Sequence, residues 1–141
     1  MIVLDTNVVS ELMQPRPDPA VVAWVDAQDA SVLCLPATCV GEILYGIARL
    51  PAGKRRDRLA EQLTDMLTSD FAGRVLPFDD CCAPLFAQIA ADRDACGRPV
   101  SVADAQIAAV CRRHDAPLAT RNTKDFVSTG VTLLNPWQDA A

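Results

Sequence analysis

Short aliphatic runs alternate with helical patterns along the 141-residue chain. A short apolar run bounded by polar or turn-forming residues is the pattern of a buried strand. Apolar residues that recur every three or four positions indicate a helix packed on one side. Strands that alternate with helices form a parallel sheet with helices on both faces. Because 141 residues is the usual length of one domain, we predict a single α/β domain over residues 1–141.

The boundaries of the predicted elements come from the residues that begin and end each pattern. The proline series that starts at Pro15 ends a first short helix, Thr38 can cap a later helix, and Gly97 ends another. We predict strands at residues 2–4, 32–35, 74–76, 117–119 and 131–134. We predict helices at residues 8–13, from 19 through 25, 39–50, 53–68, from 79 or 80 to about 95, and 101–114, with a loop at 120–126.

Composition narrows the protein class. Half of the residues are hydrophobic but only 5% are aromatic, so the core must be aliphatic. The net charge of −5 argues against a broad basic surface for nucleic acid, but it is compatible with a carboxylate cluster that binds a cation. No apolar run approaches the roughly 20 residues of a membrane span, and the N-terminus has no basic leader. We therefore expect a cytoplasmic protein with no membrane partner.

The six cysteines are predicted to be reduced thiols that act as small core residues. Cys81 and Cys82 are adjacent, and no C-x-x-C pair occurs. His114 is the only histidine, which argues against a structural zinc site.

Four acidic residues lie at strand ends or near helix starts. In open α/β sheets, ligands bind beyond the carboxyl ends of the strands. The four acids are Asp5, Glu42, Asp104 and Asp125, and the polar residues beside them are Thr6, Asn7, Ser101, Thr120, Arg121 and Asn122. This distribution predicts a site built from distant parts of the chain.

Each acid also has a purely structural interpretation. Asp5 can cap the helix that follows it, and Ser101 with Asp104 resembles a capping box. Glu42, placed in the first turn of its predicted helix, favours the helix dipole, and Asp125 can be a turn residue. Taken singly, capping explains Asp5 and Asp104 about as well as a functional role does.

Convergence of these acids would favour a metal site. Neighbouring carboxylates raise one another's pKa unless a cation neutralises them. Hard oxygen ligands without His or Cys point to Mg²⁺ or Mn²⁺, which activates water and stabilises charge on a phosphate. Arg49, Arg121 and Lys124 are candidate phosphate ligands. Gly46, on the Glu42 face of its helix, would allow another segment to approach closely.

The ordered set of these segments resembles the PIN-domain family, and within it the VapC/FitB-like toxins of type II toxin–antitoxin systems. The resemblance spans the whole chain. It rests on the segments LDTNVVSEL, VGEILYGIARLPAGK, RVLPFDD, SVADAQIAA and ATRNTKDF, and on the terminal NPW. The DTN triplet alone is weak evidence for the family, but the ordered set of segments that ends with ATRN-x-x-DF is highly specific for it.

The resemblance implies a three-layer α/β/α sandwich and a ribonuclease, a hydrolase of ester bonds that leaves a 5′-phosphate and a 3′-hydroxyl. It implies Mg²⁺ as cofactor, with Mn²⁺ as a substitute, and a homodimer. It also implies a cognate antitoxin whose tail covers the active site, often with an inserted Arg, and which alone contacts operator DNA. The family's acidic positions match Asp5, Glu42, Asp104 and, less securely, Asp125; its supporting polar positions match Thr6, Asn7, Ser101, Thr120 and Asn122.

Two other functions stay open at this point. One is a non-catalytic PIN-like binding module within a DNA-bound toxin–antitoxin complex. The other is a different metal-dependent phosphotransfer enzyme, such as a DNA nuclease or a phosphatase. A phosphatase of the haloacid dehalogenase type would want D-x-D after the first strand, where this chain has D-T-N.

Overall fold

The computed structural model describes residues 1–139 and contains a five-stranded sheet of order β3-β2-β1-β4-β5. All of its strand pairings are parallel. The strands are β1 (Ile2–Leu4), β2 (Leu33–Pro36), β3 (Val75–Leu76), β4 (Leu118–Ala119) and β5 (Leu133–Leu134). The predicted parallel sheet is confirmed, and each predicted strand is present.

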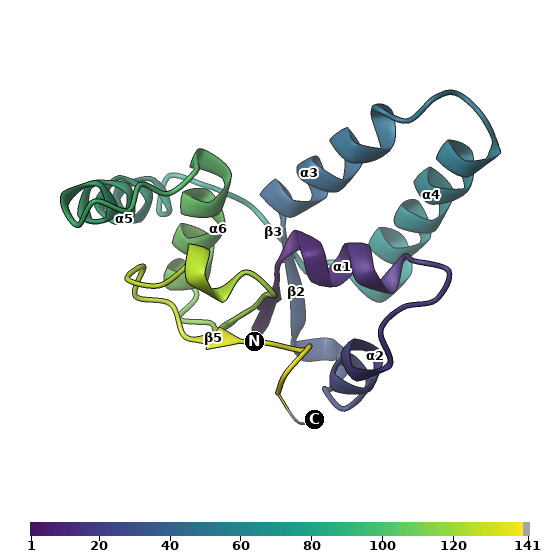
Figure 1. Ribbon diagram of the computed structural model, residues 1–141, viewed down its shortest axis with the longest axis horizontal. Coiled ribbons are helices and arrows are strands. Elements are labelled where there is room, and N and C mark those ends of the chain that lie inside the picture. Colours follow the sequence, from purple (N-terminus) through teal and green to yellow (C-terminus); the bar gives the residue numbers. More distant parts are fainter. Residues whose placement is uncertain (140–141) are drawn as a thin grey trace.

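Helices cover both faces of this sheet, α1 to α4 on one side and α5 with α6 on the other (Figure 1). They are α1 (Thr6–Leu12), α2 (Pro19–Asp26), α3 (Ala37–Ala48), α4 (Lys54–Asp65), α5 (Ala83–Ala95) and α6 (Val102–Arg113). Short turns of other helix types are η1 (Ala30–Val32), η2 (Met66–Asp70) and η3 (Thr123–Asp125). The chain runs from β1 to β3 in one direction and then returns to β4 and β5, so right-handed crossovers place the two helix groups on opposite faces. The three-layer sandwich is confirmed.

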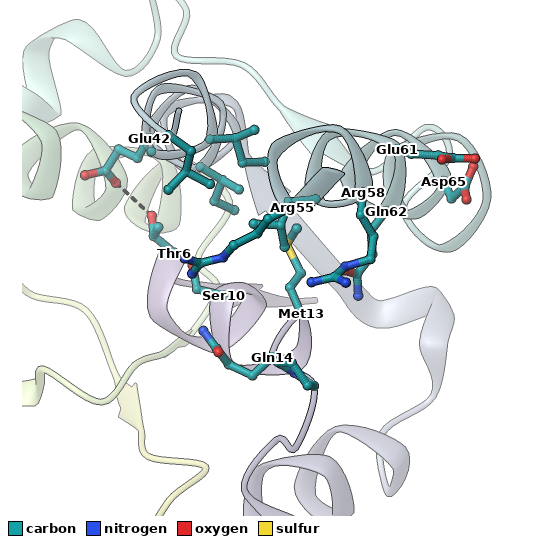
Figure 2. Close-up of a pocket in the computed structure, with 16 residues that line it drawn as sticks. Thr6, Ser10, Met13, Gln14, Glu42, Arg55, Arg58, Glu61, Gln62 and Asp65 are labelled. Atoms are coloured by element: carbon teal, nitrogen blue, oxygen red, sulfur yellow. Dashed lines mark hydrogen bonds between the residues drawn. The ribbon is translucent and has the colours of Figure 1, made fainter. Parts of the chain in front are cut away.

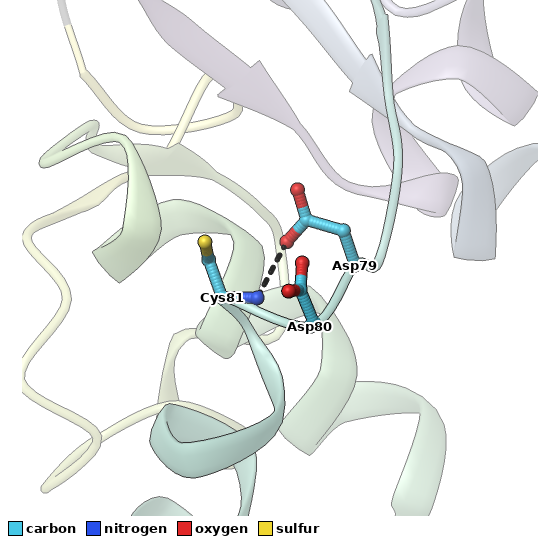
Figure 3. A group of neighbouring side chains, drawn as sticks. All are labelled: Asp79, Asp80 and Cys81. Carbon is cyan, nitrogen blue, oxygen red and sulfur yellow. Dashed lines mark hydrogen bonds between the residues drawn. The ribbon is translucent and has the colours of Figure 1, made fainter.

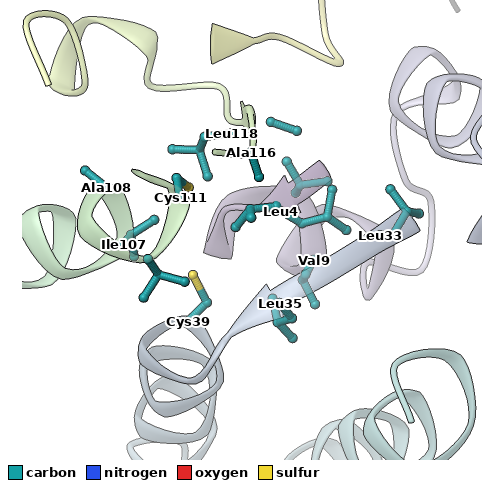
Figure 4. Close-up of a cluster of buried hydrophobic side chains, with 14 of the residues drawn as sticks. Leu4, Val9, Leu33, Leu35, Cys39, Ile107, Ala108, Cys111, Ala116 and Leu118 are labelled. Carbon is teal, nitrogen blue, oxygen red and sulfur yellow. The ribbon is translucent and has the colours of Figure 1, made fainter. Parts of the chain in front are cut away.

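The core lies between the central strands and the helices that cover them. Leu4, Leu35 and Leu118 are fully buried on neighbouring strands, and Ile107 of α6 packs with them (Figure 4). Each such aliphatic side chain stabilises the fold by roughly 1.5–3 kcal/mol. The core is aliphatic, as the composition predicts.

The start of α3 differs from the prediction. The helix begins at Ala37, directly after Pro36, so Thr38 lies inside its first turn and is not the cap. Instead, the Thr38 hydroxyl donates to Oε1 of Gln106 at 3.2 Å and joins α3 to α6. Glu42 therefore lies in the second turn of α3, and not in the first turn as predicted.

All six cysteines are free thiols. Cys34, Cys39, Cys82 and Cys111 are buried, whereas Cys81 and Cys96 are exposed. Within the described residues, no helix is long and apolar enough to cross a membrane.

Candidate active site

The reversal of strand order between β1 and β4 creates the candidate site. Val3 of β1 pairs with Leu118 of β4, and the chain leaves these two strands toward opposite faces of the sheet. A crevice opens beyond the carboxyl ends of strands at such a reversal. The residues that follow these strands directly are Asp5 and Thr120.

Asp5 is the most enclosed acid of the site, with only 4% of its surface exposed. Its Oδ1 accepts a hydrogen bond from the Thr6 backbone N–H at 2.8 Å. Its Oδ2 accepts from the Thr120 hydroxyl at 2.7 Å and from the Asn7 amide at 3.1 Å. Burial raises the pKa of Asp5 above its ordinary value, although these donors oppose the rise. Asp5 thus caps α1, as its structural interpretation predicts, and its second oxygen lies at the strand reversal.

A polar network fixes the two loops that meet at Asp5. Asn7 accepts a hydrogen bond from the Arg121 backbone N–H at 3.1 Å. Thr120, which is fully buried, accepts from the Asn122 backbone N–H at 3.0 Å. The polar residues that follow β1 and β4 therefore hold each other in place.

Glu42 joins the site from α3. Its Oε1 accepts a hydrogen bond from the Thr6 hydroxyl at 2.7 Å (Figure 2). Its negative charge adds to the burial that raises the pKa of Asp5. Glu42 is exposed, so it lies at the open side of the site.

Asp104 approaches from the first turn of α6. The Ser101 side chain caps this helix by accepting from the Asp104 backbone N–H at 3.1 Å. Burial, together with the charges of Asp5, Asp125 and Glu42, raises the pKa of Asp104 to about 6 against the opposing Ser101 hydrogen bond. The charges of the other three predicted acids therefore raise the pKa of Asp104. The structure brings all four acids to the same end of the sheet.

The acid cluster suits a hard divalent cation in its donor chemistry. It offers carboxylate oxygens only, and the like charges around Asp104 are the kind of repulsion that a cation relieves. The ligand atoms of this cluster are more widely spaced than those of one other group: within residues 1–139, the one group of three candidate ligands with all ligand atoms within 4.8 Å of one another lies elsewhere.

That tighter group is Asp79, Asp80 and Cys81, which are all exposed (Figure 3). Asp79 Oδ1 accepts hydrogen bonds from the backbone N–H groups of Cys81 and Cys82 at 3.1 and 3.2 Å. These contacts make the segment an ordinary turn before α5.

A groove of about 960 Å³ leads away from the acid cluster. It starts at Thr6 and Glu42 and runs between α1, α3 and α4 (Figure 2). Its walls combine apolar side chains with two arginines of α4: Met13, Ile43, Ile47, Leu50, Leu59, Arg55 and Arg58. Gly46 also lines it, and a Cβ atom at this position would meet nothing within 4 Å. The Gly46 face of α3 is therefore open within the described residues, and the close approach of another segment to it stays a prediction.

Residues 2–131 match the family model described as "PIN domain". The chain belongs to the PIN-domain family. This PIN domain is 44% identical over 140 residues to the VapC ribonuclease Y4jK of Sinorhizobium fredii. The match covers 99% of this chain and 100% of the relative. It is 41% identical over 139 residues to Toxin FitB of Neisseria gonorrhoeae, at 99% and 100% coverage.

A solved structure of FitAB bound to the IR36 DNA fragment has the same fold as this PIN domain. The TM-score is 0.92 at 39% identity, and the match covers 100% of this chain and 99% of that chain.

Sequence reasoning missed two features of the PIN-domain site. Arg93, predicted only as part of a helix, is buried and donates to the main chain of the loop that carries Asp125. Trp137 lies under the Arg121 guanidinium, 5.2 Å from ring centre to Cζ. Neither contact has a local sequence signal, because each joins residues more than ten positions apart.

Two buried thiols also lie near Asp5. Cys39 Sγ lies 4.0 Å from Asp5 Oδ1, and burial together with the Asp5 charge raises the pKa of Cys39 far above its ordinary value. The same two causes raise the pKa of Cys111. Both thiols stay protonated and are not nucleophiles.

Proposed function

We propose that this PIN domain is a metal-dependent endoribonuclease, and the toxin of a type II toxin–antitoxin pair. The observation that carries the proposal is the gathering of Asp5, Glu42, Asp104 and Asp125 around the strand reversal, where Asp104 has a pKa of about 6. Relatives named VapC ribonuclease and Toxin FitB, both matched over their whole length, support it.

Asp5, Glu42 and Asp104 would hold Mg²⁺, with Asp125 completing the set, and Mn²⁺ would substitute. When bound, such an ion activates water and stabilises negative charge on a phosphodiester. Thr6, Asn7 and Thr120 keep Glu42 and Asp5 oriented through the hydrogen bonds described above. Groups that orient ligands in this way commonly change metal affinity or activity by roughly 10–100-fold when they are removed.

The RNA backbone would be held by Arg121. Its main chain is fixed to Asn7, and its guanidinium is stacked on Trp137. Stacking limits the freedom of the guanidinium and leaves its N–H groups available for a phosphate. Cleavage would leave a 5′-phosphate and a 3′-hydroxyl, and Ser101 and Asn122 support the geometry of the acids.

The partner would be an antitoxin whose tail lies in the groove between α1, α3 and α4 and ends at the acids. The apolar groove walls suit an apolar segment, and the carboxylates suit a basic side chain such as Arg. A basic inhibitor also complements the net charge of −5. In this proposal the chain is cytoplasmic and forms a homodimer, and the complex reaches operator DNA only through the antitoxin, since the toxin is acidic.

The proposal is tested by cleavage of RNA and DNA of matched sequence, each with Mg²⁺, with Mn²⁺ and with a chelator. The expected result is metal-dependent cleavage of RNA alone. Cleavage of DNA alone would identify a DNA nuclease. No cleavage, together with no thermal stabilisation by Mn²⁺, would identify a non-catalytic binding module.

A further inference from the structure

Arg93 of α5 is a buried cation whose hydrogen bonds go to main-chain carbonyl groups. It is 5% exposed. Its Nη1 donates to the carbonyl oxygens of Asp125 at 2.9 Å and Val127 at 2.8 Å, and its Nε donates to the carbonyl oxygen of Arg98 at 2.6 Å. One guanidinium thus joins the end of α5 to the loop that carries Asp125, 32 residues away in sequence.

The same loop is held from within. Phe126 is 1% exposed, and the Thr129 hydroxyl donates to its carbonyl oxygen at 2.5 Å. Ser128, between them, adopts a left-handed conformation with φ of 63°. A non-glycine residue keeps this conformation only where its surroundings impose it. The loop is therefore specified in detail around Asp125.

Burying a guanidinium destabilises the fold unless protein contacts replace its hydration, which contributes roughly several kcal/mol. For the general packing of α5 against the loop, an apolar side chain of similar size would serve as well or better. What an arginine adds is geometry: its planar guanidinium directs Nη1 at two carbonyl groups of one loop while Nε holds the Arg98 carbonyl group after α5. The loop that Nη1 contacts is the one that carries the fourth acid.

We propose that Arg93 is a positioning residue for Asp125, which it holds at the edge of the acid cluster through the Asp125 and Val127 carbonyl groups. This rests on the proposed function, because it assigns Asp125 to the same cation site. Arg93 itself touches neither cation nor RNA. Its effect passes through the loop, so it should vanish when the Asp125 carboxylate is absent.

The test is a double-mutant cycle with Arg93→Met, Asp125→Asn and the combined variant. Mn²⁺ affinity is measured by the paramagnetic resonance signal of free Mn²⁺, and kcat and KM are measured on RNA. Alone, Arg93→Met should weaken Mn²⁺ binding and lower kcat by roughly 10–100-fold, with KM for RNA little changed. In the Asp125→Asn background, Arg93→Met should have no further effect on either quantity.

A matched control is Arg74→Met. Arg74 also donates to main-chain carbonyl groups, those of Leu33 and Asp70, but far from the Asp125 loop. It should lower stability without changing Mn²⁺ affinity. Arg93→Lys retains the charge but has one donor nitrogen in place of the separate Nε and Nη1 donors. It should show an intermediate loss, and it replaces Arg93→Met in the cycle if that variant does not fold.

Additive losses in the combined variant, or Mn²⁺ affinity unchanged in the single Arg93 variant, would overturn the positioning role. A wild-type chain that binds Mn²⁺ but cleaves no RNA contradicts the proposed function instead, and the Mn²⁺ cycle then decides the role of Arg93. A wild-type chain that binds no Mn²⁺ overturns both.

Discussion

Thr120 shows how a single side chain links the fold to the site. Its hydroxyl is fully buried, donates to Asp5 Oδ2 and accepts from the Asn122 backbone N–H. The fold and the site therefore depend on the same hydroxyl group.

Thr120→Val keeps the shape of the side chain but removes one hydrogen-bond donor to Asp5. This loss should lower the free energy of unfolding by about 1–3 kcal/mol. RNA cleavage should fall by roughly 10–100-fold. Urea unfolding and cleavage rates check this. Thr120→Ser, which retains the hydroxyl, should stay near wild type, and equal losses in both variants would contradict the role given to the hydroxyl.

Asp104 should make the stability of the metal-free protein depend on pH. Its pKa is raised to about 6 in the folded protein from an ordinary value of 3.8, so between these values the folded state binds a proton that the unfolded state has lost. Stability should therefore fall as pH rises from about 4 to about 6. Denaturant unfolding in chelator across this range measures the decline, and Asp104→Asn should reduce it. A decline that is unchanged in Asp104→Asn would show that other groups cause it.

At the residue scale, sequence alone predicts the acids and the polar residues that bond to Asp5 and Glu42, but not the residue that holds the Asp125 loop. Asp5 and Asp125 follow predicted strands, which marks them as candidates, and the structure places both near Asp104. Arg93 could not be selected, because its partners are main-chain carbonyl groups, which carry no residue-specific signal. The capping interpretations of Asp5 and Ser101 were also correct, since capping and membership of the acid cluster use different atoms of the same segments.

At the scale of the elements, the alternating pattern predicts the strands well and the helix starts less well. The first helix begins at Thr6, two residues before the predicted start, because the Asp5 side chain caps it there. The third begins at Ala37 without a side-chain cap, because its N-cap residue is Pro36, and the Thr38 hydroxyl bonds to Gln106 of a helix distant in sequence. Boundaries of this kind depend on tertiary contacts that local propensity does not contain.

The groove between α1, α3 and α4 makes a prediction about the proposed antitoxin. Gly46→Leu should improve helix propensity by roughly 0.5–1 kcal/mol and should fit, because nothing lies within 4 Å of an added Cβ atom. It should nevertheless weaken antitoxin binding at least tenfold by filling the groove, and leave RNA cleavage in place. Binding to the protein encoded beside this gene, measured by calorimetry, checks the expectation.

Gly41→Leu is the matched control for this experiment. Gly41 lies in the same helix, has the same open surroundings and is not among the residues that line the groove. It should gain similar stability and keep antitoxin affinity. Equal affinity in both variants would show that the antitoxin docks elsewhere.

At the scale of the whole molecule, the order of the strands decides where the acids meet. The sequence pattern predicts a parallel sheet, whereas the reversal between β1 and β4 becomes visible only in the structure. This reversal explains why loops more than a hundred residues apart, at Asp5 and Thr120, share a hydrogen bond. The position of the site follows from this topology.

The aliphatic core and the acid cluster are separate, so a cation should add stability without being needed for folding. Mn²⁺ at about 100 times its Kd should raise Tm by roughly 5–10 °C, whereas chelator should leave the protein folded. Thermal unfolding followed by circular dichroism measures both. Asp104→Asn should lose most of the rise. Unfolding in chelator would show that the cation is structural.

The most direct test of the central claim is RNA cleavage by Asp5→Asn beside the wild-type chain, at saturating Mn²⁺, with cleavage ends mapped. Asn also caps helices well, so α1 should be retained and Tm should change little, while the buried carboxylate oxygen that meets Thr120 is lost. The wild type should leave 5′-phosphate ends, and Asp5→Asn, although folded, should cleave at least about a hundredfold more slowly. Cleavage by folded Asp5→Asn at the wild-type rate would contradict a catalytic role for the acid cluster.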